Sequence, residues 1–126
     1  MQNSKKILII DDDRAFMEEM LGRFREEKDI KVFSAGNGEE GFELVKNEKP
    51  DAVLLDLIMP KLDGIGFLKK LRSDLDEDMS ETPVFIVTQQ SDAKRVAETA
   101  RYNIKGYFIK NASTFDQVIS KIRQMK

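Results

Sequence analysis

Short apolar segments alternate along the chain with longer amphipathic ones. Five short segments are mostly apolar, which is typical of strands buried on both faces of a sheet. These predicted strands are residues 5–10, 31–35, 53–55, 83–88 and 106–109. The segment at 31–35 is shorter and more polar than the first, so we expect it near an edge of the sheet.

Apolar residues at helical spacing fill the intervals between these strands. They predict helices at about residues 14–27, 39–47 and 65–73, a helix capped by Ser91, and a last helix that opens at Thr114. The Ser91 helix has an apolar face made of Ala93, Val96, Ala97 and Ala100. Residues 74–82 are polar and rich in acids and are predicted to form a loop.

Alternating strands and helices predict the architecture. Asp13 and Asp63 precede two of the helices, where a carboxylate caps free backbone N–H groups. Five strands that alternate with five helices predict an α/β fold, a doubly wound parallel sheet with helices on both faces. No repeat, linker or low-complexity segment indicates a second domain, so residues 1–126 are expected to form one domain.

The composition narrows the possible chemistry. The chain of 126 residues has no cysteine and no histidine, which excludes disulfides, thiol catalysis, Cys-ligated zinc and a Ser-His-Asp triad. Any metal must be bound by oxygen ligands, which favours Mg²⁺ or Ca²⁺. The apolar run at residues 7–10 is too short for a signal peptide or a membrane span, so we expect a cytoplasmic protein without membrane contact.

Charge bears on the possible partners. The net charge of −2 is too acidic for a nucleic-acid binder. Residues 91–126 nevertheless carry 8 basic and 3 acidic side chains, a balance of +5. This basic segment either faces an acidic protein partner or is a solvated surface.

Polar residues stand where four of the predicted strands end. Asp11 and Asp12 follow the first strand, Asp56 the third, Thr88 ends the fourth and Lys110 follows the fifth. The carboxyl ends of parallel strands meet at one edge of a sheet, so these groups are expected to share one crevice. Crowded carboxylates favour a cation such as Mg²⁺, and an amine and a hydroxyl beside it suit a phosphoryl group. An aspartate can itself accept that group as an aspartyl phosphate.

These residues resemble the response regulator receiver domain family over essentially the whole chain. The resemblance comes from the acidic pair after the first strand, Asp-Leu-Ile-Met-Pro-Lys-Leu-Asp-Gly starting at Asp56, Thr88, and Tyr107-Phe-Ile-Lys110. It implies a flavodoxin-like sheet with strand order 2-1-3-4-5. It also implies a two-component phosphorelay protein that is a signalling domain and not an enzyme.

The resemblance further implies a role for each site residue. Asp56 would accept a phosphoryl group from a histidine kinase or a phosphotransfer protein. Mg²⁺ would be bound by Asp12, Asp56 and the Ile58 carbonyl, with Asp11 acting mainly through water. Thr88 and Lys110 would contact the phosphoryl oxygens, and Tyr107 would swing inward as Thr88 moves toward the phosphate.

The signal is expected to leave through the face formed by the fourth helix, fifth strand and fifth helix. Much of the basic excess belongs to this region: Lys94, Arg95, Arg101, Lys105, Lys121 and Arg123. No DNA-binding segment follows in this sequence, so the expected output is contact with a protein and not with nucleic acid, unless the sequence is a piece of a longer chain.

Several positions modify this expectation. Asn111 stands where the family usually has a proline after a cis bond. A cis bond without proline costs about 3 kcal/mol, so this bond is either trans with a reshaped loop or cis and strained.

Two further differences concern the switch and the phosphoryl lifetime. Gln89 stands after Thr88, where the family usually has a small residue, and it would restrict the space into which the Tyr107 ring moves. Ile58 and Gln90 are expected to flank the water that hydrolyses the phosphoryl group, so hydrolysis should be slow unless Gln90 orients that water.

Two other functions remain open. Asp11-x-Asp13, Thr88 and Lys110 also resemble the first motifs of haloacid dehalogenase-type phosphatases, in which Asp11 would be the nucleophile. That family needs a further acidic pair after the lysine, and Asp56 would have no role. The other alternative is a receiver-like binding module that takes no phosphate.

A glycine pattern also requires interpretation. Gly36-Asn-Gly-Glu-Glu-Gly41 matches the dinucleotide-binding pattern literally, but it follows the second strand, and its two glutamates would repel a pyrophosphate. We interpret it as a turn before an acidic helix start.

Overall fold

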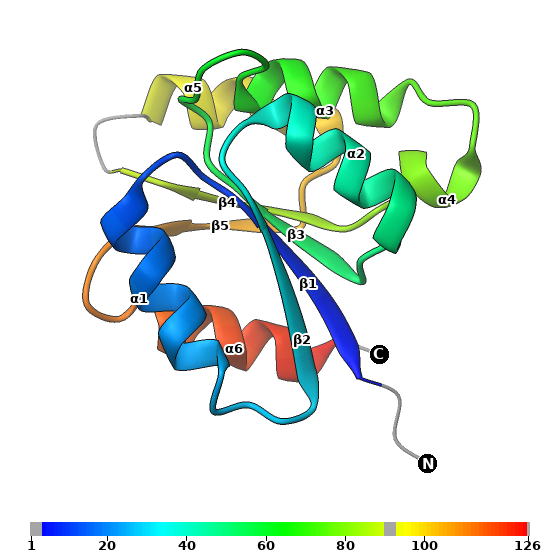
Figure 1. Ribbon diagram of the computed structural model, residues 1–126. Helices are drawn as coiled ribbons and strands as arrows, with labels where there is room; N and C mark the ends of the chain where they lie inside the picture. The colour runs from blue at the N-terminus through cyan, green and yellow to red at the C-terminus, as the bar shows by residue number, and fades with distance from the viewer. Residues whose placement is uncertain (1–3, 90–92, 126) are drawn as a thin grey trace.

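The protein is built on a five-stranded parallel sheet. The computed structural model describes residues 4–89 and 93–125 (Figure 1). The strands are β1 (Lys5–Ile10), β2 (Ile30–Ala35), β3 (Ala52–Leu55), β4 (Val84–Thr88) and β5 (Gly106–Ile109). Their order is β2-β1-β3-β4-β5, which confirms the predicted topology and the edge position of the second strand.

Helices cover both faces of the sheet, as predicted. They are α1 (Arg14–Phe24), α2 (Gly38–Glu48), α3 (Gly64–Arg72), α4 (Glu77–Ser80), α5 (Ala93–Glu98), the 3₁₀-helix η2 (Thr99–Tyr102) and α6 (Thr114–Gln124). In Figure 1, α1 and α6 lie on one face, whereas α2, α3 and α5 lie on the other. None of the helices that the structure describes is long and apolar enough to cross a membrane.

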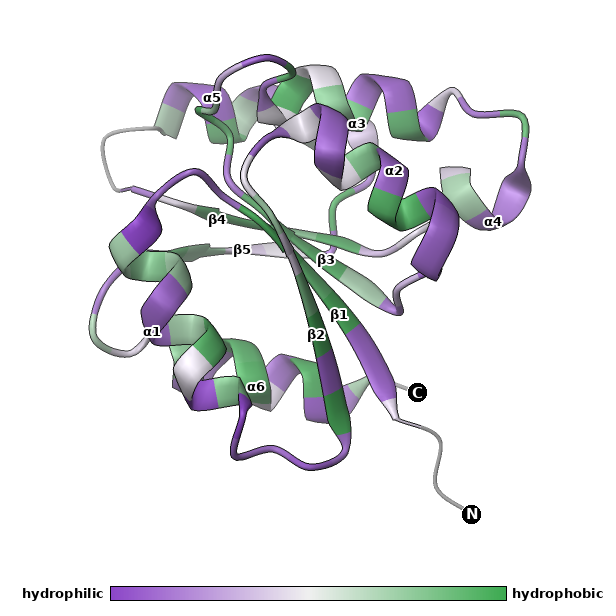
Figure 2. Ribbon diagram, viewed as in Figure 1, coloured by the Kyte–Doolittle hydropathy of each residue, from purple (hydrophilic) through white to green (hydrophobic). Residues whose placement is uncertain are grey.

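Each face of the sheet has its own apolar core. Alternate residues of β1 divide between the cores, with Leu8 and Ile10 facing α2 and α3 while Ile7 and Ile9 face α1 and α6. The strands are accordingly apolar along most of their length, whereas apolar and polar residues alternate along the helices (Figure 2). The apolar runs in the sequence therefore reflect a sheet that is buried on both faces.

Two predictions about helices need correction. The acidic segment predicted as a loop contains α4, because the Asp76 carboxylate accepts a hydrogen bond from the Asp78 N–H and Met79 is buried beneath the turn. The first helix ends at Phe24, three residues earlier than predicted.

The predicted apolar face of the fourth helix was wrong in most positions. In α5 and η2, Val96 is only partly buried, and the alanines at positions 93, 97 and 100 are exposed. Alanine has little apolar area, so burying it contributes little to holding a helix on the sheet. The predicted cap, Ser91, lies outside the described residues.

The Arg72 guanidinium, in the last turn of α3, links the ends of the two short helices α4 and η2. It donates hydrogen bonds to the carbonyl oxygens of Ser80 (2.9 Å) and Thr82 (2.7 Å) after α4. It also donates to the carbonyl oxygens of Tyr102 (2.7 Å) and Asn103 (3.3 Å) at the end of η2. Ser80 and Tyr102 are the last residues of α4 and η2, so one side chain caps the carboxyl ends of both helices.

Candidate functional site

The sheet brings the predicted site residues to one edge. The Asp11 N–H donates to the Ala35 carbonyl (3.0 Å) and the Asp56 N–H to the Ile10 carbonyl (2.9 Å). The Lys110 N–H donates to the Thr88 carbonyl at the end of β4 (2.8 Å). The ladder therefore continues one residue past β1, β3 and β5, and this register fixes where each side chain leaves the sheet.

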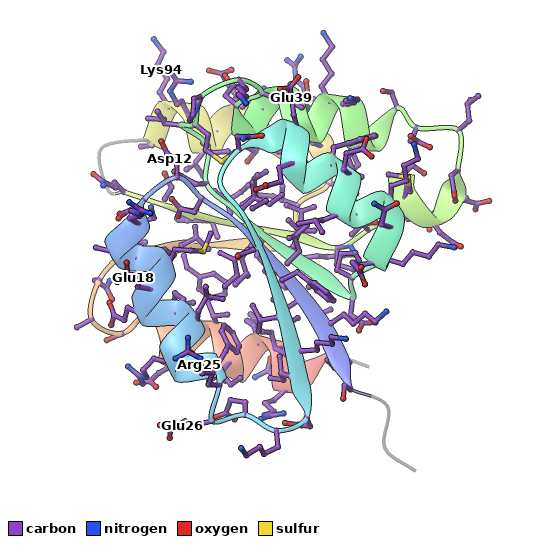
Figure 3. The ribbon with its side chains drawn as sticks, viewed as in Figure 1. Asp12, Glu18, Arg25, Glu26, Glu39 and Lys94 are labelled. Carbon is purple, nitrogen blue, oxygen red and sulfur yellow. The ribbon has the colours of Figure 1, made fainter. Side chains whose placement is uncertain are left out.

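Three aspartates converge there. One carboxylate oxygen from each of Asp11, Asp12 and Asp56 lies within 4.8 Å of the other two. Asp11 and Asp56 are only 3% and 7% exposed, whereas Asp12 is exposed in the short loop before α1 (Figure 3). Two of the three charges are therefore removed from water, which is costly unless cations compensate them.

Lys110 supplies one compensating charge. Its ammonium nitrogen lies 2.8 Å from Asp11 Oδ2, 3.6 Å from Asp13 Oδ2 and 3.9 Å from Asp56 Oδ2. It also lies 4.7 Å from the centre of the Phe16 ring, which adds a cation–π contact. One ammonium thus faces three carboxylates, and negative charge remains in excess.

The pKa values reflect this imbalance. Burial, followed by the charge of Asp11, raises the pKa of Asp56 to about 7. Burial also raises the pKa of Asp11, against the lowering effect of Lys110. Burial alone would lower the pKa of Lys110, but its close contact with Asp11, together with the charges of Asp56 and Asp13, outweighs burial and raises it. Without a further cation, the pocket favours holding a proton on a carboxylate.

The donor set fits a hard divalent cation. Asp11 Oδ1 accepts a hydrogen bond from the Asp13 N–H (2.9 Å). Asp11 Oδ2 is buried and accepts no well-aligned hydrogen bond from the described residues, so its contact with Lys110 is an ion pair at short distance. Mg²⁺ prefers one or two carboxylates and retains several waters, which suits two buried carboxylates beside the exposed Asp12.

The loop after β3 is held by close contacts that the sequence did not reveal. The Gly64 N–H donates to the Leu57 carbonyl (3.0 Å), and a Cβ at Gly64 would lie 2.5 Å from the Asp56 carbonyl oxygen. On the other side, a Cβ at Gly38 would overlap the Leu62 carbonyl oxygen. Within this loop Met59 is buried, whereas Ile58, two residues after Asp56, is 50% exposed.

The contact at Gly38 also explains the glycine pattern before α2. Its third glycine, Gly41, packs against the Ile10 side chain, where a Cβ would overlap the end methyl (Cδ1) of Ile10. Asn37 caps α2 by accepting the Glu40 N–H (2.9 Å). The glycines serve close packing of α2 against β1 and the loop after β3, in agreement with the predicted turn and acidic helix start.

The remaining predicted site residues lie around this centre. Thr88 is 1% exposed, whereas Tyr107 is 57% exposed and points away from the core. The Lys110–Asn111 bond is trans, the first of the two predicted alternatives. Gln89 is exposed, and Gln90 lies outside the described residues.

Comparison with known proteins identifies relatives of the same type. The response regulator receiver domain family matches residues 7–123. The probable C4-dicarboxylate response regulator DctR of Bacillus subtilis is 33% identical over 96% of this chain and 53% of its own length. The response regulator MprA of a Mycobacterium species is 40% identical over 73% of this chain and 38% of its own length. The chain thus spans about half, or less, of these curated relatives.

Solved structures show the same fold along nearly the whole chain. The receiver domain of the Francisella response regulator 1452 is 28% identical, with a TM-score of 0.79 over 95% of this chain and 94% of that one. The receiver domain of AraT from Geobacillus stearothermophilus is 25% identical, with a TM-score of 0.80 over 95% and 93% of the two chains. With the family match and this architecture, the chain belongs to the response regulator receiver domains of two-component signalling.

Proposed function

We propose that this receiver accepts a phosphoryl group on Asp56 from a histidine kinase or a phosphotransfer protein. The observation that supports the proposal most is the position of the Asp56 carboxylate, which is 7% exposed and shares its pocket with Asp11, Asp12 and Lys110. Such a concentration of buried charge is costly to fold, and a phosphoryl group with a cation would use it.

The proposed reaction is a phosphoryl transfer. A carboxylate oxygen of Asp56 forms a bond to the phosphorus of a phosphohistidine, and the P–N bond breaks with its electron pair passing to the imidazole nitrogen. The product is an acyl phosphate on Asp56. The Lys110 ammonium, now 3.9 Å from Asp56 Oδ2, would pair with a phosphoryl oxygen, and Thr88 would donate its hydroxyl to another.

Asp11, Asp12, Asp56 and the Ile58 carbonyl would hold Mg²⁺. When bound, the ion would neutralise carboxylate charge and stabilise the charge that develops on the phosphoryl oxygens. Asp56 must be ionised to attack phosphorus, and its raised pKa of about 7 leaves much of it protonated at neutral pH. Cation binding at this cluster would favour the reactive carboxylate.

Phosphorylation would act on the surface formed by α5, β5 and α6, which corresponds to the predicted output face. Tyr107 is exposed on β5, and Thr88 lies on β4 opposite Ile109, two residues along the strand from the tyrosine. Movement of Thr88 toward a phosphate would leave space for the tyrosine ring. Lys94 projects from α5 away from the sheet (Figure 3). The Arg123 guanidinium forms ion pairs with Glu27 and Asp29, so its charge is already compensated within the protein.

The same proposal covers a single domain over residues 1–126, a cytoplasmic location and an output through a protein partner instead of direct contact with nucleic acid. The basic residues exposed on α5 and around β5 support a partner with acidic groups.

The test is incubation with acetyl phosphate and Mg²⁺, followed by intact mass measurement. We expect one added phosphoryl group in the wild type and none in Asp56→Asn. A wild type that takes no phosphate would favour the binding-module alternative. Labelling that persists in Asp56→Asn and disappears in Asp11→Asn would favour the phosphatase-like alternative, which the family match over residues 7–123 otherwise disfavours.

A further inference from the structure

A buried hydroxyl lies where the loop after β5 meets α6, and it has no role in the chemistry proposed above. Thr114 is 1% exposed and is the first residue of α6. Its Oγ1 accepts a hydrogen bond from the Asn111 N–H at 2.7 Å. The same oxygen lies within donating distance of the carbonyl oxygens of Ile109 (3.0 Å) and Asn111 (2.9 Å). A hydroxyl has one proton, so it donates to one of these carbonyls at a time while it accepts the N–H.

These contacts flank Lys110 on both sides. The Ile109 carbonyl precedes the lysine and the Asn111 N–H follows it, and both meet the Thr114 hydroxyl. The N–H of Lys110 itself donates to the Thr88 carbonyl (2.8 Å). The two peptide units on either side of the Lys110 Cα are therefore both held by hydrogen bonds.

Backbone position matters here because lysine reaches its targets through a flexible four-carbon chain. The Lys110 ammonium nitrogen must stay near Asp11 Oδ2 (2.8 Å) and Asp56 Oδ2 (3.9 Å) to meet a phosphoryl group. A fixed direction of the Cα–Cβ bond limits the rotamers that place it there. Displacement of a charged group by about 1 Å can cost about a hundredfold in rate.

We propose that Thr114 is a positioning residue for Lys110 and that Asn111 supplies the N–H on which this depends. Proline at position 111 would have no N–H to donate. The Asn111 side chain has a separate contact, since its Oδ1 accepts the Ser113 N–H (2.7 Å). The role of Thr114 rests on the proposed phosphorylation of Asp56, but the ordering of the loop does not.

The test compares four proteins. Thr114→Val removes the hydroxyl and keeps the shape, whereas Thr114→Ser keeps the hydroxyl. Ser113→Ala is the matched control, because Ser113 is exposed and its side chain makes no capping hydrogen bond. With acetyl phosphate and Mg²⁺, we expect Thr114→Val to form acyl phosphate about ten to a hundred times more slowly than the wild type. Thr114→Ser should recover most of that rate, and Ser113→Ala should match the wild type.

Hydrogen exchange at the Lys110 amide gives a second measurement that needs no phosphorylation. We expect exchange to accelerate in Thr114→Val and to return toward the wild-type rate in Thr114→Ser. Asn111→Pro should slow phosphorylation and, combined with Thr114→Val, add little to its effect, because both remove the same contact.

Three results would overturn the positioning role. These are a wild-type phosphorylation rate in Thr114→Val, an equal loss in Thr114→Ser, and an unchanged exchange rate at Lys110 in Thr114→Val. A wild type that takes no phosphate would instead refute the proposed function, and the exchange measurement would still decide whether Thr114 orders the loop.

Discussion

The buried Asp56 carboxylate should make the metal-free protein less stable as the pH rises. Its pKa increases from 3.8 to about 7 on folding, so the folded state holds a proton that the unfolded chain releases. Below about pH 4 both states are protonated and there is no penalty. Between pH 4 and 7 the penalty grows, and above pH 7 it levels off. At 1.36 kcal/mol per pKa unit the full penalty is about 4 kcal/mol, an upper limit because the carboxyl groups of Asp11 and Asp56 interact and titrate together.

Urea unfolding at pH 5 and pH 8 in a chelator measures this penalty. Asp56→Asn should unfold with a higher free energy than the wild type at pH 8, by up to about 4 kcal/mol, and the difference should shrink at pH 5. Asp78→Asn is the matched control, because Asp78 is exposed on α4, away from the site. Saturating Mg²⁺ should reduce the pH dependence of the wild type. Equal pH dependence in the wild type and Asp56→Asn would refute the reasoning.

Three further substitutions test the surroundings of the site. Gly38→Ala should lower the free energy of unfolding by about 1–3 kcal/mol, because its Cβ would overlap the Leu62 carbonyl, whereas Gly22→Ala, with nothing within 4 Å, should raise it slightly. Arg72→Met should remove about 2 kcal/mol or more and accelerate amide exchange around α4 and η2, which an unchanged exchange pattern would contradict. Ile58→Asn should speed loss of phosphate from the acylated protein, since a polar group would then reach the attacking water; an unchanged rate of loss would show that Ile58 does not limit hydrolysis.

The sequence predicted the strands well because burial on both faces leaves a continuous apolar run. Reading only the residues at the strand ends then predicted that Asp11, Asp56, Thr88 and Lys110 meet, and the register of the ladders places them together. This inference succeeded because one topological rule converts distant positions into neighbours.

The parts that escaped prediction depend on tertiary contacts. The loop after β3 packs closely against Gly38 and Gly64. The absence of a side chain at these two glycines matters only because another part of the backbone approaches them. The helix α4 spans four residues, too few to show a period. The alanines of α5 match a helical face, but the pattern does not reveal that they remain exposed. At Asn111 the sequence left two backbone geometries open, and the trans bond accompanies the hydrogen bond to Thr114.

The most direct test of the account is chemical mapping of the phosphorylated residue. The protein is treated with acetyl phosphate and Mg²⁺, the acyl phosphate is reduced with borohydride, and the peptides are sequenced by mass spectrometry. The account predicts that the reduced residue, homoserine, stands at position 56 and nowhere else. Modification at Asp11 or Asp12, with Asp56 intact, would contradict it.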